Sequence, residues 1–141
     1  MLIHRGEAWL DAGQARNFDA SGDNNGYVDA LAVNVQFDER PEIRPEEVLA
    51  TSHAASYCLT LWNRLKQSGH TPRRVHTVAY IRHEQANASQ TESEIFLNTN
   101  AEITGMSEEL FASQVNAAKS DFVAIRGLAG VPVRVETILY A

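Results

Sequence analysis

A single cysteine carries most of the redox chemistry that this sequence could perform. Cys58 is the only thiol among the 141 residues, which excludes an intrachain disulfide and a zinc site built from cysteines. A reactive cysteine needs an electropositive or helix-N-terminal setting that lowers its pKa. Cys58 lies about three and a half turns into a predicted helix, where the effect of the helix dipole has faded. The pattern therefore favours a small buried hydrophobe over a reactive thiol.

A histidine and a serine on the same predicted helix offer a second kind of chemistry. His53 precedes Ser56 by roughly one turn, so it could act as the base for a Ser56 nucleophile in acyl transfer. No third group that would orient the histidine is visible, and we expect His53 instead to be a core histidine with a backbone or water partner. His76 and His83 lie on or beside one predicted strand and face opposite sides of it. We therefore expect no metal site and no cofactor.

The composition indicates one domain spanning residues 1–141. With 44% hydrophobic and 21% charged residues, the chain can bury an ordinary core, and it lacks the low hydrophobicity of disordered proteins. The formal net charge of -6 and the absence of any basic stretch longer than Arg73–Arg74 argue against a nucleic-acid partner. No secretory signal or membrane-spanning stretch is visible, so we expect a cytoplasmic protein that contacts no membrane.

The predicted elements place these side chains in an α+β fold. A helix is expected over residues 45–68, because Pro45 is favoured at the first helical position and Gly69 is placed to cap the end. Ser107 is expected to cap a second helix, and Ser120–Asp121 a further short one. Strands that cluster instead of alternating strictly with helices are typical of α+β proteins. They are expected over residues 3–10, 31–37, 75–82, 92–103 and 131–139, with residues 14–18 pairing back on the first and with the third and fourth forming a hairpin.

The predicted helix over residues 45–68 has apolar residues around nearly its whole circumference. A helix of this kind is normally buried on all sides. A domain of this size has few ways to surround it. Either a sheet wraps around the helix, or the helix packs against the same helix of a second subunit.

The sequence of this helix resembles that of a known protein family. Residues 44–61 read R-P-E-E-V-L-A-T-S-H-A-A-S-Y-C-L-T-L, which is similar to the central helix of the OsmC/Ohr family, with its N-P-E-E-L start and A-H-A-A-C-F segment. Residues 9–16 resemble the N-terminal hairpin of that family, and G-H-T-P at residues 69–72 resembles the turn after its helix. Residues 117–128 lie where the family has its second cysteine.

The resemblance implies an α+β fold in which a strongly curved antiparallel sheet wraps around the long central helix. It also implies an intertwined homodimer with two sites at the subunit interface. In active members a peroxidatic cysteine attacks the hydroperoxide, an arginine and a glutamate orient it, and a second cysteine resolves the sulfenic acid as a disulfide.

Carried over residue by residue, the family pattern is met only in part. The glutamate corresponds to Glu46 and the arginine to Arg16, with Arg5 as a weaker candidate. The peroxidatic position is occupied by Ser56, and the resolving position by Ser120, give or take one residue. A serine hydroxyl is not ionised near neutral pH without a strong base, and it cannot cycle through a sulfenic acid or a disulfide. The pattern therefore predicts that thiol peroxidase activity has been lost.

Two hypotheses follow from the resemblance. The leading one is a dimeric, non-peroxidase OsmC-like protein with an interface pocket for a small apolar or anionic ligand. That pocket would be edged by Arg16, Glu46, Ser56 and Ser120, although Arg16 and Glu46 could equally form an ion pair that serves the dimer. The alternative is a one-cysteine hydroperoxide reductase that uses Cys58. Two residues turn a helix by about 200°, so Cys58 should face away from the site that Ser56 lines, and the alternative requires local rewinding or a site on the other face.

Overall fold

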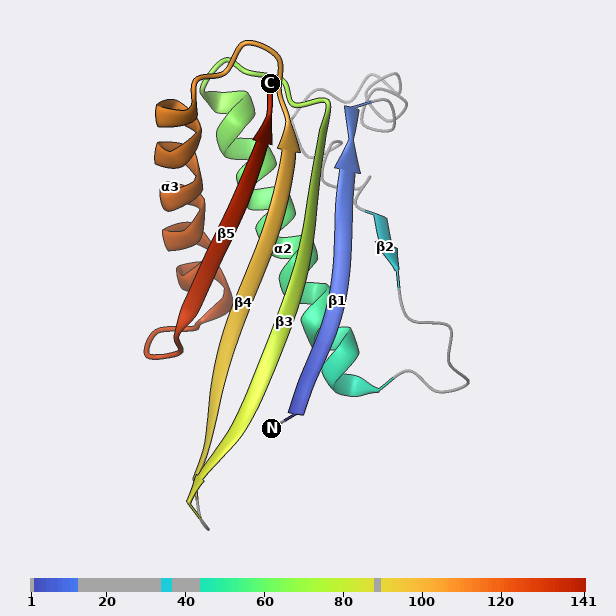
Figure 1. Cartoon of the computed structure of the whole chain (residues 1–141), viewed down its shortest axis with the longest axis vertical. Coiled ribbons are helices and arrows are strands. Elements are labelled where there is room, and N and C mark those ends of the chain that lie inside the picture. Colours follow the sequence, from blue (N-terminus) through green and yellow to red (C-terminus); the bar gives the residue numbers. More distant parts are fainter. Residues whose placement is uncertain (1, 13–33, 37–43, 88–89) are drawn as a thin grey trace.

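Five strands and two helices make up the described part of the chain. The structure is a computed structural model that describes residues 2–12, 34–36, 44–87 and 90–141. Its elements in chain order are β1 (Leu2–Asp11), β2 (Asn34–Gln36), α2 (Pro45–Gln67), β3 (Arg74–Asn87), β4 (Gln90–Glu102), α3 (Glu108–Arg126) and β5 (Val133–Tyr140) (Figure 1). The expected hairpin partner at residues 14–18 lies outside the described residues, as does most of the expected strand at 31–37.

The strands form one mixed sheet in the order β2-β1-β3-β4-β5. The pairs β1–β2, β1–β3 and β3–β4 are antiparallel, and the predicted hairpin of β3 and β4 is confirmed. β5 runs parallel to β4, with Ile95 opposite Val133. The expectation of a wholly antiparallel sheet was therefore wrong at this edge. The physical reason is that α3 connects β4 to β5, and a strand that returns after a crossover helix can run parallel to the first.

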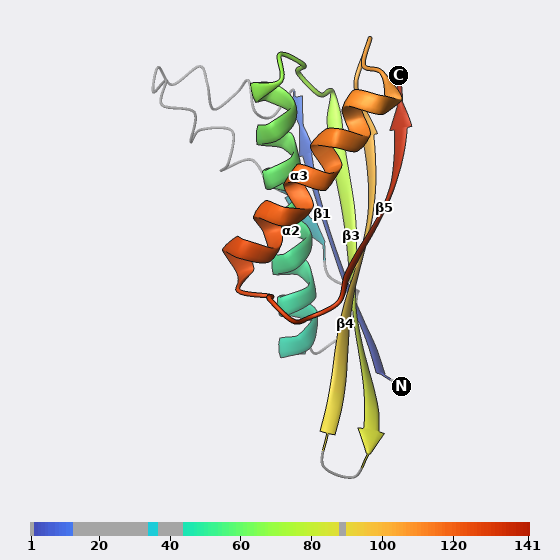
Figure 2. The ribbon, with the colours of Figure 1, turned by 90° about the vertical axis from the view of Figure 1, so that its left-hand side faces the viewer.

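Both helices lie on the same face of the sheet, which gives two layers with the core between them (Figure 2). The strands bury alternate side chains, as expected for a sheet covered on one face: Val75, Ala79, Leu97 and Ala101 are buried toward the helices. Thr77 and Thr99 are also buried on this face, and their hydroxyl groups form a hydrogen bond of 3.0 Å with each other. The largest core side chains from the helices are Tyr57, Trp62 and Phe122.

Local sequence signals fix the ends of α2. Pro45 occupies the first turn with Glu46 and Glu47, which suits the positive end of the helix dipole. At the other end Gly69 has a φ of 89°, a conformation that favours glycine, and its N–H donates to the carbonyl of Lys66. Both ends were predicted from the sequence.

α3 is one continuous helix from Glu108 to Arg126, so the predicted separate short helix at Ser120 is wrong. Ser107 caps the helix as predicted, because its side chain accepts a hydrogen bond of 3.2 Å from the backbone N–H of Leu110. The Ser-Asp pair that suggested a second cap instead lies mid-helix, where Asp121 binds Arg64 of α2.

β1 approaches α2 very closely at one glycine. A methyl group added to Gly6 would overlap the backbone and hydroxyl of Thr51. Since any larger residue would force the helix off the sheet here, Gly6 sets how closely α2 lies against β1.

Candidate functional site

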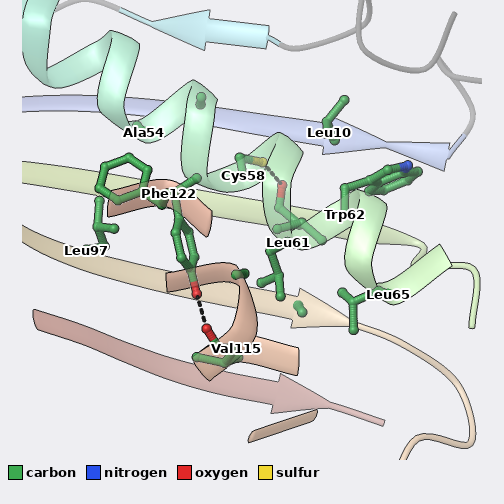
Figure 3. Close-up of a cluster of buried hydrophobic side chains, with 14 of the residues drawn as sticks. Leu10, Ala54, Cys58, Leu61, Trp62, Leu65, Leu97, Val115 and Phe122 are labelled. Atoms are coloured by element: carbon green, nitrogen blue, oxygen red, sulfur yellow. Dashed lines mark hydrogen bonds between the residues drawn. The ribbon is translucent and has the colours of Figure 1, made fainter. Parts of the chain in front are cut away.

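The only thiol of the chain is sealed inside the core. Cys58 is 0% exposed, and its thiol donates a hydrogen bond of 3.3 Å to the carbonyl of Val75 (Figure 3). Burial raises the pKa of Cys58 to about 12, and hydrogen bonds from Thr77 and the backbone of Leu10 offset this only in part. The group is therefore a protonated thiol at neutral pH, which is neither a nucleophile nor accessible to a peroxide.

Ser56 lies on a different side of α2 from Cys58, as the helical spacing predicts. Cys58 points toward the sheet, where its bonding partner is on β3, whereas Ser56 is half-buried. The carbonyl of Ser56 accepts a hydrogen bond of 2.7 Å from the hydroxyl of Thr60. A thiol at position 58 thus cannot replace one at position 56 without rewinding the helix.

The other residues predicted for the site are spread over the chain. Glu46 is exposed in the first turn of α2, about 15 Å along the helix from Ser56 at 1.5 Å per residue. Ser120 is exposed on α3, on the side opposite the buried Ala118 and Phe122. Among the described residues, no hydrogen bond or ion pair joins Glu46, Ser56 and Ser120. Arg16 lies outside the described residues.

Arg5, the weaker candidate for the site arginine, lies on the wrong face of the sheet. It alternates with the buried Gly6 and so points away from α2. Its guanidinium is 3.5 Å from the carboxylate of Glu7, which also bonds to His76 at 2.9 Å. Arg5 therefore cannot reach Ser56 of the same chain.

The structure assembles a different polar cluster between α2 and α3, from Ser52, His53 and Arg126. Nε of Arg126 donates to Nδ1 of His53 at 3.2 Å, and Nη2 of Arg126 donates to Oγ of Ser52 at 2.8 Å. His53 is buried, whereas Ser52 and Arg126 are half-buried. The His53 ring also contacts the edge of Phe122, at 5.7 Å between ring centroids. The cluster is thus a rigid polar patch at the border of the core.

Burial, together with the nearby charge of Arg126, keeps His53 neutral. Burial, and secondly the positive charge of Arg126, lower the pKa of His53 to about 4, so the ring is neutral at neutral pH. The prediction of a core histidine is correct, but its partner is an arginine side chain and not the backbone or water. Because Nδ1 of His53 already accepts from Arg126, and no described hydrogen bond joins His53 to Ser56, the geometry opposes acyl transfer by Ser56.

Sequence reasoning did not single out Arg126. The residue is the basic member of the last turn of α3, an ordinary position for a cation that faces a helix C-terminus. Its partners lie on another helix, more than seventy residues earlier in the chain. No local pattern could have indicated this contact.

The face of α2 turned away from the sheet carries exposed apolar side chains. Val48 is 49% exposed and Leu49 is 46% exposed. Between Glu47 and Arg64 the helix contains no Asp, Glu, Lys or Arg. A helix face exposed to water normally carries charges, so this surface differs from an ordinary solvated one.

The sequence of this chain was compared with those of known proteins. No protein-family model matches the chain. The sequence is 24% identical over 123 residues to Peroxiredoxin OsmC of Escherichia coli (strain K12), a match that covers 85% of this chain and 86% of that protein. Peroxiredoxin OsmC of Shigella flexneri matches with the same values. The chain is thus similar to proteins of the OsmC/Ohr family.

Solved structures related to the OsmC/Ohr family share the fold. The organic hydroperoxide resistance protein OhrB of Bacillus subtilis superposes with a TM-score of 0.59 at 18% identity, covering 70% of this chain and 73% of that chain. The OsmC-like protein from Mycoplasma pneumoniae gives a TM-score of 0.61 at 13% identity and covers 77% of this chain and 89% of that chain. The expected α+β class is therefore confirmed.

Two further observations concern the described part of the chain. No helix there is long and apolar enough to cross a membrane. No group of three or more His, Cys, Asp or Glu side chains there could hold a metal ion. Among the described residues, the cluster of Ser52, His53 and Arg126 joins both helices, as does the ion pair of Arg64 with Asp121.

Proposed function

We propose that this OsmC/Ohr protein is a homodimer that lacks thiol peroxidase activity and binds a small ligand at the subunit interface. The observation that carries the loss of peroxidase activity is the state of Cys58, which is fully buried and has its pKa raised to about 12. A peroxidase of this family type would need an ionised thiol in contact with the hydroperoxide. The same observation opposes the alternative of a one-cysteine hydroperoxide reductase.

The uncharged outer face of α2 supports the dimer. Val48 and Leu49 would leave apolar surface in water in a single chain, and a second copy of the same helix would cover it. A two-fold symmetric contact of this kind is the commonest way in which identical chains associate. A second copy on this face would also bury the apolar residues that the sequence places around nearly the whole circumference of the helix.

The interface pocket would be edged by the residues at the family's site positions. These are Glu46 and Ser56 on α2, Ser120 on α3, and Arg16. We propose a small apolar or anionic ligand, because this site has an uncharged helix face beside charged groups. The cytoplasmic location expected from the sequence is part of the same proposal.

Turnover of cumene hydroperoxide with a dithiol tests the loss of peroxidase activity. We expect the wild type to show no activity above background and to match the Cys58→Ser variant. The relative from Escherichia coli, Peroxiredoxin OsmC, serves as a positive control under the same conditions. Turnover in the wild type that disappears in Cys58→Ser would overturn the proposal and establish the alternative.

Sedimentation of two matched variants tests the dimer. Leu49→Glu places a charge on the outer face of α2 and should shift the protein from dimer to monomer. Ile138→Glu makes the same change at a residue that is 50% exposed on β5, and the dimer should persist. A wild type that sediments as a monomer would contradict the proposed association.

A further inference from the structure

We propose that Arg126, held by Ser52 and His53, is a binding site for the carboxylate of a small organic acid. This inference rests on the proposed function, because it gives the chemical class of the ligand that this region of the α2 surface would bind. Arg126 lies outside the set of residues that the family resemblance assigns to the site.

The hydrogen bonds that Arg126 forms with described residues use only one edge of its guanidinium. Its Nε–H and one Nη2–H form one edge of the planar group, and these bind His53 and Ser52. At the other end, Nη1 and Nη2 each have an N–H that points in the same direction. A carboxylate accepts two parallel hydrogen bonds from such a fork, which is the strongest geometry for this pair.

The charge of Arg126 also has no opposite partner among the described residues. Both residues that hold it are neutral: Ser52 is a hydroxyl, and the lowered pKa of His53 leaves its ring uncharged. In the described part of the chain, no carboxylate lies within ion-pair distance of Arg126. The neighbouring bridge between the same two helices differs, because Arg64 there binds Asp121 at 2.7 Å.

The site is accessible and pre-organised. Ser52 and Arg126 are both half-buried, so Arg126 keeps contact with solvent while one edge of its guanidinium is fixed. Two hydrogen bonds already restrict the arginine, which lowers the entropic cost of binding.

Titration of the 15N-labelled protein with hexanoate tests the site, observed at the Nε–Hε signal of Arg126. We expect a saturable shift of this signal in the wild type. Hexanamide, which has the same shape without the charge, should bind at least about tenfold more weakly because it loses the charge-assisted bonds. A wild type whose Arg126 signal does not move with hexanoate would overturn the inference.

A matched pair of variants assigns the binding to one arginine. Arg126→Gln should weaken hexanoate binding by at least about tenfold, measured by calorimetry, while Arg64→Gln should leave it unchanged because Arg64 already has a carboxylate partner. Equal binding by Arg126→Gln would refute the site. Sedimentation of the same samples separates the two proposals. A dimer that does not bind hexanoate contradicts only the carboxylate site. A monomer that binds hexanoate contradicts only the proposed homodimer.

Discussion

Native labelling of Cys58 should be extremely slow. The perturbation is the addition of a thiol reagent such as 5,5′-dithiobis(2-nitrobenzoate) to the folded protein near neutral pH. Burial raises the pKa of Cys58 from 9.0 to about 12, so the fraction of thiolate falls by about a thousandfold relative to an ordinary cysteine. The side chain is also 0% exposed, so the reagent reaches it only when the protein opens.

The assay compares the labelling rate in buffer with the rate in strong urea at the same pH. We expect the folded protein to react at least about a thousandfold more slowly than the unfolded chain. The double variant Cys58→Ser/Ser56→Cys is the control, because its thiol sits at a half-buried position and should react faster in the folded state. Native labelling of wild-type Cys58 within about tenfold of the unfolded rate would refute the reasoning.

Three other predictions concern stability, each measured by urea unfolding. Gly6→Ala should lower the free energy of unfolding by about 3 kcal/mol, because the new methyl group overlaps Thr51. A decrease below about 1 kcal/mol would contradict the close approach of α2 and β1. Stability should fall as the pH drops from 6.5 toward 4, because the unfolded chain then protonates His53 while the folded chain does not, with its pKa of about 4. Solvent near the half-buried Arg126 reduces this loss of stability to about 1–2 kcal/mol. The variant His53→Asn keeps an acceptor for the guanidinium and should make stability depend less on pH. An equally steep pH dependence in that variant would assign the loss to other groups. Ser107→Ala removes the cap of α3 and should lower the free energy of unfolding by about 1 kcal/mol. An unchanged free energy of unfolding would show that the hydrogen bond of the cap is not formed in solution.

Local signals in the sequence were sufficient to predict most of the elements. Pro45 and Gly69 bound α2, Ser107 begins α3, and short runs rich in apolar residues indicate the strands β3 and β4. Helical spacing also predicted correctly that Cys58 and Ser56 lie on different sides of α2. Each of these features depends on residues within a few turns or strand repeats of each other.

Features set by distant contacts were missed. The direction of β5 depends on which strand it joins after α3, and no residue of β5 encodes that choice locally. Ser120–Asp121 has the composition of a helix cap, but the bond between Asp121 and Arg64 holds it within a continuous helix. The role of Arg126 arises only when α3 packs against α2, which brings it to His53 and Ser52.

Mass spectrometry after exposure to hydroperoxide tests most directly the claim that this OsmC-like fold holds no reactive thiol. The folded protein would be mixed with stoichiometric cumene hydroperoxide and dimedone, which traps sulfenic acids. We predict that Cys58 stays unmodified, while the thiol of the double variant Cys58→Ser/Ser56→Cys is trapped. A dimedone adduct on wild-type Cys58, formed while the protein remains folded, would contradict the account.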